Sequence, residues 1–216
     1  NFSMPLYQTI SESEATRIYI WKVEESEELL AKNTILTSNS KQRVAGMRSE
    51  IHRRGYLSIR HLLAEAGYTD NDLFYDEAGK PHLKDGSFIS ITHSGIFTGI
   101  IVSKEKEVGI DIEKQRNKII PIAHKFTPIK EYKAITNKET LIRKLTVVWG
   151  AKESLYKIYA TKGLSFLKHI YIHDFTLNAL DTTGIINFYG ERSSYDIDFL
   201  EIDGYTCVYA LKRSNE

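Results

Sequence analysis

The order of hydrophobic and polar residues predicts an α+β protein with mostly antiparallel sheets. Short apolar segments typical of strands alternate with polar turns and with longer segments that have helical spacing. The predicted strands cover residues 18–23, 87–92, 98–103, 108–112, 170–175, 184–189, 195–202 and 206–211. A helical region extends from Ile119 to about Tyr159 and is broken near Pro128. We therefore expect two α/β halves, residues 1–105 and 106–216.

Local signals set the ends of several elements in the first half. Ser26 is a suitable N-cap for a short helix through Leu30. Gly67 is suited to a left-handed cap at the end of the next helical region. The segment 76–81 contains Gly79 and Pro81 and is predicted to be a turn.

A basic helix is predicted between Lys41 and His61. Val44, Met47 and Ile51 recur there at helical spacing, and only Glu50 opposes the cations. The cations are Lys41, Arg43, Arg48, Arg53, Arg54 and Arg60. This run is either a solvated face or a phosphate-binding surface, and the pattern leaves both open.

Composition narrows the class of protein. Of the 216 residues, 42% are hydrophobic and 26% are charged, and no long apolar run occurs, so we expect a soluble globular protein without a membrane span. The net charge of +1 gives no case for nucleic-acid binding. The single Cys207 forms no internal disulfide, and no signal peptide is visible, so we expect a cytoplasmic location.

Two carboxylates share one face of the strand that begins the second half. In Gly109-Ile110-Asp111-Ile112-Glu113, strict alternation puts Asp111 and Glu113 on the same side, about 7 Å apart. Carboxylate oxygens are ligands that Mg²⁺ prefers, often together with substrate phosphates. The alternative is an edge strand with a solvated face.

A second constellation lies 40 residues further along, on the long predicted helix. In Trp149-Gly-Ala-Lys-Glu-Ser-Leu-Tyr-Lys157, Glu153 and Lys157 are four residues apart and share a face. The alternative is an ordinary surface ion pair. His93 ends a strand just before Gly95, where it is either structural or close to a ligand.

Two other kinds of site are not supported by the sequence. His169 and His173 alternate along a predicted strand, so we reject a zinc site on a helix. No glycine-rich loop of the P-loop or Rossmann type is present, which disfavours nucleoside triphosphates and dinucleotides as ligands.

Taken together, the ordered motifs resemble the 4′-phosphopantetheinyl transferase superfamily in its larger single-chain form, from roughly residue 41 to 175. The similarity is carried by the strand 109–113 and by Trp-x-x-Lys-Glu-Ser-x-x-Lys at 149–157. Three neighbours also match: Gly79-Lys80-Pro81, the strand end 90–94, and Lys162-Gly163-Leu164-Ser165. Gly150 departs from the pattern, because relatives more often have a larger or hydroxylated residue there.

The resemblance implies a fold, an activity and a set of site residues. The fold is a pseudo-dimer of two similar α/β subdomains, with coenzyme A bound in the cleft between them. The implied metal ligands for Mg²⁺ are Asp111, Glu113 and Glu153, and Lys157 matches the lysine that meets the phosphates of coenzyme A. The further implied coenzyme A contacts are Arg54, Lys80, Pro81, Thr92 and His93, with Arg53 as the alternative to Arg54.

The implied reaction transfers the 4′-phosphopantetheine group of coenzyme A to a serine of an apo acyl or peptidyl carrier protein and releases 3′,5′-ADP. Glu153 and Lys157 are the implied catalytic residues. We expect a monomer that binds coenzyme A and the carrier protein but no nucleic acid or membrane, with Arg43, Lys162 and the apolar segment 164–167 as a hypothetical docking surface. Two alternatives are an inactive module that binds coenzyme A or the carrier, and another magnesium-dependent enzyme that acts on phosphodiesters. The sequence does not indicate which carrier is modified.

Overall fold

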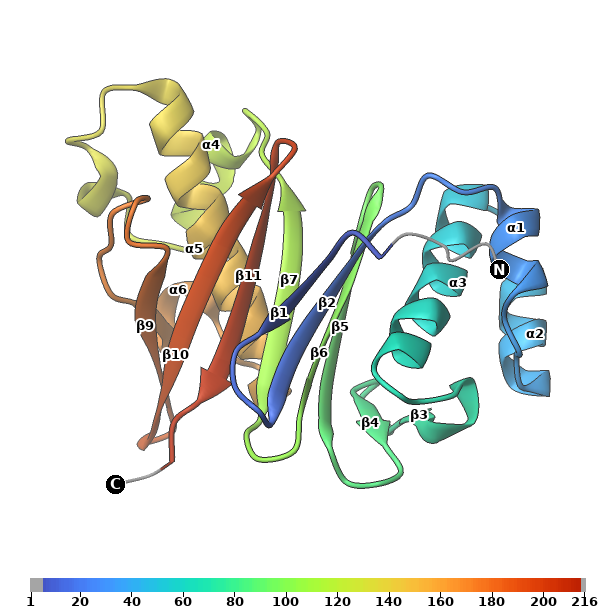
Figure 1. Ribbon diagram of the computed structural model, residues 1–216. Coiled ribbons are helices and arrows are strands. Elements are labelled where there is room, and N and C mark those ends of the chain that lie inside the picture. Colours follow the sequence, from blue (N-terminus) through green and yellow to red (C-terminus); the bar gives the residue numbers. More distant parts are fainter. Residues whose placement is uncertain (1–5, 215–216) are drawn as a thin grey trace. The chain divides into compact units, whose positions relative to one another are not determined.

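Two antiparallel sheets, each packed against a long helix, make up the computed structural model (Figure 1). The structure describes residues 6–214. It divides into two compact units, Asn1–Glu105 and Lys106–Glu216. The predicted α+β class with antiparallel sheets is confirmed. That the two units are related subdomains stays a prediction.

The first unit contains a four-stranded sheet in the order β1-β2-β6-β5. Its strands are β1 (Gln8–Ser11), β2 (Thr16–Lys22), β5 (Phe88–Ser94) and β6 (Phe97–Ser103). Its helices are α1 (Glu27–Lys32), α2 (Ser38–Gly46) and α3 (Glu50–Glu65), and α3 packs against β6 and β2. A small hairpin of β3 (Leu73–Tyr75) and β4 (Pro81–Leu83) surrounds the predicted turn.

The second unit contains a five-stranded sheet in the order β7-β11-β10-β9-β8. Its strands are β7 (Val108–Lys114), β8 (Ile170–Ile172), β9 (Asp181–Phe188), β10 (Glu191–Ile202) and β11 (Tyr205–Lys212). The helix α5 (Lys138–Tyr159) packs across β7 and β11, and the short helices are α4 (Ile119–Ile122) and α6 (Phe166–His169). Two 3₁₀ turns, Ala123–Lys125 and Ile129–Tyr132, lie on either side of Pro128, so the predicted break there is confirmed.

The helix ends follow from side-chain caps. The Ser26 hydroxyl accepts a hydrogen bond from the Leu29 amide, which confirms the predicted cap of α1. Asn137 caps α5 by accepting from the Thr140 amide. Gly67 follows α3 with φ +85°, the left-handed conformation that its place in the sequence predicted.

The prediction of one continuous basic helix is wrong. The region forms two helices, α2 and α3, and Met47 between them is extended with ψ 120°. Arg53 holds this link, because its Nη1 donates to the carbonyl oxygens of Met47 and Arg48. The apolar spacing through Met47 continues across the break, so the pattern alone did not reveal it.

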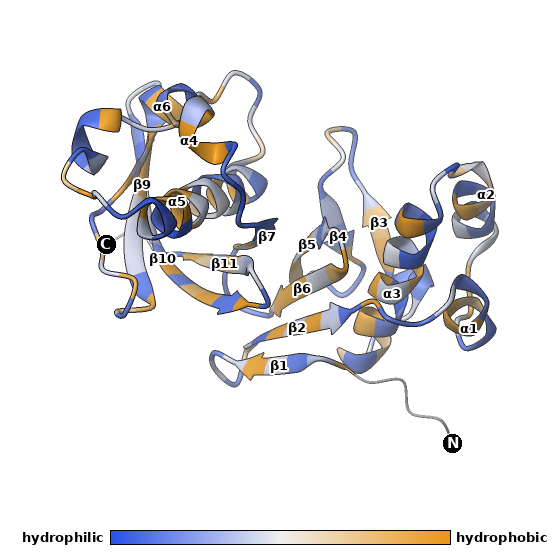
Figure 2. Cartoon of the chain, turned by 90° about the horizontal axis from the view of Figure 1, so that it is seen from above, coloured by the Kyte–Doolittle hydropathy of each residue, from blue (hydrophilic) through white to orange (hydrophobic). Residues whose placement is uncertain are grey.

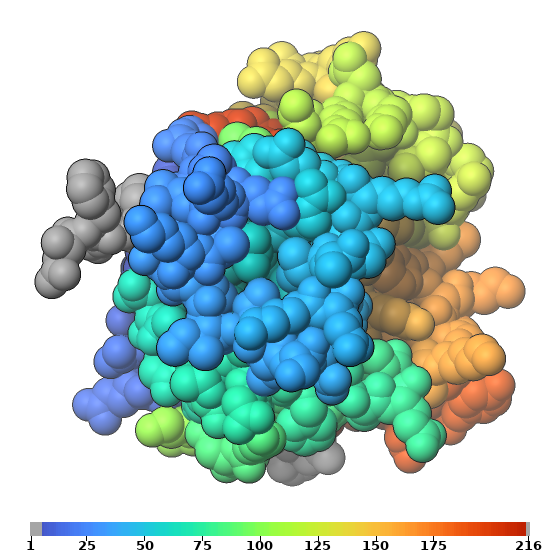
Figure 3. All heavy atoms as spheres, turned by 90° about the vertical axis from the view of Figure 1, so that its right-hand side faces the viewer, coloured from blue at the N-terminus to red at the C-terminus, as the bar shows by residue number. Residues whose placement is uncertain are grey.

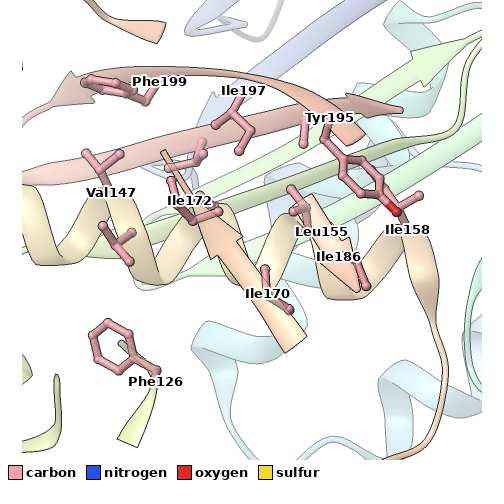
Figure 4. Close-up of a cluster of buried hydrophobic side chains, with 14 of the residues drawn as sticks. Phe126, Val147, Leu155, Ile158, Ile170, Ile172, Ile186, Tyr195, Ile197 and Phe199 are labelled. Atoms are coloured by element: carbon pink, nitrogen blue, oxygen red, sulfur yellow. The ribbon is translucent and has the colours of Figure 1, made fainter. Parts of the chain in front are cut away.

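Each unit has its own hydrophobic core. In the second unit, α5 buries Val147, Leu155 and Ile158 against strand residues such as Ile186 and Tyr195 (Figure 4). In the first, Leu57, Leu62 and Leu63 of α3 pack with Trp21 of β2 and Ile100 of β6. Colouring by hydropathy shows hydrophobic residues along β2 and β6 and along β10 (Figure 2). Even the 22-residue α5, like every other helix within residues 6–214, is too polar or too short to cross a membrane.

Candidate functional site

The carboxylates of β7 lie on the strand face against which α5 packs. Asp111 is paired with Val208 of β11 and Glu113 with Thr206, in antiparallel register. A side chain on Gly109, on the same face, would overlap the backbone carbonyl of Ser154 in α5. The close approach of helix and strand therefore requires glycine at this position and brings α5 directly over the acidic face.

Gly150 allows α5 to approach β11, the strand that pairs with β7. A Cβ atom there would lie 2.8 Å from Cγ2 of Val208 and 3.7 Å from Oδ2 of Asp111. A larger residue would push α5 away from β11. The departure of this glycine from the family pattern is thus explained by local packing in this chain.

Side chains from α5 bracket the two strand carboxylates. Lys157 Nζ donates to Asp111 Oδ1 at 3.0 Å and to the Ile110 carbonyl at 2.7 Å. Trp149 Nε1 donates to Glu113 Oε1 at 3.3 Å. Glu153 lies between Trp149 and Lys157 along the helix and, at a spacing of four residues, shares the face of Lys157.

Electrostatic coupling links the three carboxylates. Burial and then repulsion from Asp111 and Glu113, partly offset by Lys157, together raise the pKa of Glu153 to about 7. Burial and then the Asp111 charge also raise the pKa of Glu113. Asp111 itself is only 6% exposed. The three carboxylates are therefore partly withdrawn from solvent and repel one another, and Lys157 offsets part of this repulsion.

The donor set matches the chemical preference of Mg²⁺. Three carboxylates supply the hard oxygen ligands that Mg²⁺ prefers, and their mutual repulsion is the condition that a divalent ion would relieve. Within residues 6–214, however, no three His, Cys, Asp or Glu side chains form a group that could hold a metal ion. The residues fit the ion in chemistry, and convergence of Glu153 on Asp111 and Glu113 stays a prediction.

On a neighbouring face of α5, Lys152 is almost fully buried. It is 2% exposed, and its Nζ donates to the carbonyl oxygens of Phe126 at 2.6 Å and Phe166 at 2.8 Å. Burial lowers its pKa to about 8, against a small opposing effect of Glu131. This lysine of the motif is therefore part of the protein interior and not a solvent-facing cation.

The residues expected to meet coenzyme A in the first unit lie in three places. His93 and Thr92 are near the end of β5, and the His93 ring occupies the space that a side chain on Gly55 of α3 would fill. Burial lowers the pKa of His93, and His52 adds to this, so the neutral ring is favoured. Gly55 is therefore required by His93 and does not interrupt the helix.

Lys80 and Pro81 lie at the β3–β4 turn, where the Lys80 amide donates to Asp76 Oδ1 at 3.0 Å. Arg54 uses its guanidinium within the fold: Nε donates to the Glu25 carbonyl and Nη2 to the Val23 carbonyl. Arg53 pairs with Glu27 at 2.8 Å. Arg54 thus stabilises the segment before α1 and Arg53 the first residue of that helix, and a role at the 3′-phosphate stays a prediction for either.

A cavity in the first unit was missed by the sequence analysis. It has a volume of about 490 Å³ and is lined by residues of α2, α3 and the β3 region. Arg43 lies over the rings of Tyr56 and Tyr75, at 6.0 and 5.7 Å from their centroids. Of the α2 residues that line it, Asn39 and Arg43 are exposed and Ser40 is buried; α2 is among the blue atoms of Figure 3. Aromatic faces beside a cation suit a planar anionic ligand.

The floor of this cavity is a buried ion pair. Arg60 Nε and Asp70 Oδ1 are 2.9 Å apart, with side chains 4% and 3% exposed. Arg60 also donates to the Tyr56 hydroxyl, and Asp70 accepts from the amide and hydroxyl of Thr37. No sequence motif joined these residues, because they come from three separate segments.

Within the apolar part of the hypothetical docking surface, the expectation of an exposed Leu164 is wrong, while Leu167 is 39% exposed. Leu164 is only 8% exposed and belongs to the core of the second unit. Phe166 packs on Trp149 and Tyr156, with ring centroids 5.4 and 5.6 Å apart. Leu164 is therefore part of the interior, Phe166 is half-buried, and a docking role for the rest of the segment stays a prediction.

Comparison with known protein families gives a match to the second unit. The family model described as the 4′-phosphopantetheinyl transferase superfamily matches residues 107–210, which is most of the second unit and includes Asp111, Glu113, Glu153 and Lys157. No curated protein matches the sequence. The family transfers phosphopantetheine from coenzyme A to carrier proteins.

Proposed function

Since the chain belongs, through residues 107–210, to the 4′-phosphopantetheinyl transferase superfamily, we propose that it transfers the 4′-phosphopantetheine group of coenzyme A to a serine of an apo acyl or peptidyl carrier protein, with Mg²⁺. The observation that carries the proposal lies within the matched segment. Asp111 and Glu113 of β7 are electrostatically coupled to Glu153 of α5, and Lys157 binds Asp111 directly.

Asp111, Glu113 and Glu153 would hold the metal ion, which when bound would neutralise charge on the pyrophosphate. In the reaction the serine oxygen forms a bond to the β-phosphorus of coenzyme A, and the bond from that phosphorus to the leaving 3′,5′-ADP oxygen breaks. Glu153 accepts the serine proton, directly or through water. The Lys157 ammonium stabilises the negative charge on the leaving phosphate.

The cavity of the first unit is our candidate for the nucleotide end of coenzyme A. A purine is planar and suits the exposed ring of Tyr75, whereas Arg60 already lies over the Tyr56 ring at 3.5 Å; the Arg43 guanidinium matches a phosphate group. The contacts implied by the family resemblance, at Lys80, His93 and their neighbours, remain part of the proposal.

The test is incubation of the protein with coenzyme A, Mg²⁺ and a panel of apo carrier proteins, followed by mass spectrometry of the carriers. We expect one carrier to gain the phosphopantetheine group, with 3′,5′-ADP released, and both to stop when EDTA is added. Glu153→Gln is the matched inactive variant. Binding of coenzyme A without any mass gain would favour an inactive binding module, and cleavage of DNA or RNA without coenzyme A would favour a phosphodiester enzyme.

A further inference from the structure

Trp149 of α5 donates a hydrogen bond to the Glu113 carboxylate, and two phenyl rings flank it. Its centroid lies 5.1 Å from that of Phe126 and 5.4 Å from that of Phe166. Phe126 is 1% exposed and packs nearly edge-on, at 68° to the indole. The orientation of the indole N–H is therefore set by where these two rings lie.

The two rings are borne by loops far apart in sequence. Phe126 ends the 3₁₀ turn Ala123–Lys125, and Phe166 is the first residue of α6. Neither element is longer than four residues, so neither has enough internal hydrogen bonds to fix its own position. Something outside these elements must hold both rings against Trp149.

Lys152 makes that connection. Its ammonium donates to the backbone carbonyls of the same two residues, Phe126 and Phe166, whose rings flank Trp149. Lys152 lies three residues after Trp149, close to one turn of the helix, so both side chains leave the helix on the same side. One buried cation thus joins two loops and fixes the aromatic cluster that they carry.

We infer that Lys152 is a positioning residue, which holds Trp149 through Phe126 and Phe166 and so orients the Glu113 carboxylate toward the reaction site. The inference rests on the proposed function, because it assigns Glu113 a role there. Lys152 touches neither substrate nor metal in this scheme. It acts on Glu113 through Trp149, as outer-shell partners of metal ligands commonly do.

The first experiment needs no metal and no substrate. The chain has two tryptophans, so Trp21→Phe leaves Trp149 as the sole indole reporter. In that background, Lys152→Met removes the ammonium but keeps a long apolar side chain. We expect greater acrylamide quenching of Trp149 and lower fluorescence anisotropy. Unchanged quenching and anisotropy in a folded Lys152→Met variant would overturn the inference.

A matched control is Lys144→Met on the same helix. Lys144 binds the Asp174 carboxylate at 2.6 Å and lies over the Phe175 ring, and neither partner belongs to the aromatic cluster. We expect its removal to leave Trp149 fluorescence unchanged. If Lys152→Met does not fold, Phe166→Leu removes one flanking ring while leaving the carbonyl and Lys152 in place. It must then loosen Trp149 in the same direction, or the inference fails.

The second experiment measures metal binding directly, with Mn²⁺ as the probe, by its EPR signal in the presence of coenzyme A. We expect Lys152→Met to weaken Mn²⁺ binding about tenfold, the lower end of the effect of outer-shell changes. The same loss should appear as a higher Mg²⁺ requirement, with the KM for the carrier changed less than about twofold. A merely structural role would lower the folded fraction without moving Mn²⁺ affinity.

A double-mutant cycle with Trp149→Phe tests the route of the effect. This variant keeps an aromatic ring but lacks the N–H that binds Glu113, so Lys152→Met should cost little more Mn²⁺ affinity in its background. Fully additive losses would overturn the route through Trp149. If the parent protein bound no Mn²⁺ with coenzyme A, the proposed function would fail, while the fluorescence result would still decide whether Lys152 holds Trp149.

Discussion

The ammonium nitrogen of Lys157 on α5 lies 3.0 Å from Oδ1 of Asp111 on β7. This contact joins a helix to a strand 46 residues away in sequence, and it balances part of the negative charge that Asp111 shares with Glu113 and Glu153. The same side chains would meet the pyrophosphate and the metal in the proposed reaction. The first prediction therefore changes the charge balance among these side chains.

Glu153→Gln should lower the transfer activity without lowering the stability of the fold. Removing this carboxylate takes away the proposed proton acceptor and a metal ligand, so transfer should fall by at least about 10²-fold. Because the pKa of Glu153 is raised, its ionised form is unfavourable in the folded protein above the ordinary glutamate pKa, and the variant should be no less stable at pH 7. Transfer assays and thermal unfolding in EDTA check both halves. Wild-type activity in the variant would contradict the proposed role.

Arg43→Ala tests the nucleotide cavity. If the Arg43 guanidinium binds the 3′-phosphate, the KM for coenzyme A should rise roughly tenfold, the loss of one charged hydrogen bond at an accessible site. The KM for dephospho-coenzyme A, which lacks that phosphate, should barely change. Lys41→Ala on the same helix is the control for general loss of positive charge. An equal rise for both substrates would argue against the cavity as the 3′-phosphate site.

Gly109→Ala should destabilise the second unit. The added Cβ overlaps the Ser154 carbonyl, which is backbone and cannot rotate away, so α5 must shift from β7 at a cost of about 2 kcal/mol or more. Gly46→Ala at the end of α2 is the matched control, since nothing lies within 4 Å of its added atom. That change should be neutral or stabilising by up to about 1 kcal/mol. Urea unfolding followed by Trp149 fluorescence in the Trp21→Phe background measures the first effect.

Asp70→Asn should make the free energy of unfolding depend less on pH in the acid range. Burial tends to raise the Asp70 pKa, but hydrogen bonds from Ser40 and Thr37 together with the Arg60 charge outweigh it, and the net pKa is lowered. A lowered pKa in the folded state contributes stability above the ordinary value of 3.8, and this is lost as the pH falls through the lower folded value. The variant leaves the Arg60 charge buried without its partner. This should lower the free energy of unfolding by about 3–5 kcal/mol at pH 7.

The measurement for this pair is urea unfolding at pH 7 and at pH 3, followed by Trp21 fluorescence in a Trp149→Phe background. The difference between parent and Asp70→Asn should be large at pH 7 and should shrink at pH 3. Asp76→Asn is the control, because Asp76 pairs with His82 on the surface, with side chains about 40% exposed. A difference that does not vary with pH would mean that Asp70 contributes through packing alone.

The sequence predicted those features that depend on local pattern. Alternation located β7, β10 and β11 to within a few residues, and the same alternation put Asp111 and Glu113 on one face. The spacing in α5 put Glu153 and Lys157 together. These results need only the period of a strand and the period of a helix.

Features that depend on distant contacts were not predictable in the same way. The break at Met47 is held by Arg53, and the cavity joins Arg43, Tyr56 and Tyr75 from separate elements. The buried state of Leu164 depends on the packing of the whole second core. In each case the pattern permits more than one structure, and tertiary contacts select among them.

The pairing of β7 with β11 also bears on how this protein can misfold. A slip of one residue in that pairing would keep most backbone hydrogen bonds, yet it would turn Asp111 and Glu113 to the opposite side of the sheet and send Ile110 and Ile112 toward α5. Gly109 opposes such a slip, because any other residue of β7 would bring a side chain into the Ser154 carbonyl. During folding the glycine therefore favours the strand alignment in which Asp111 and Glu113 face α5.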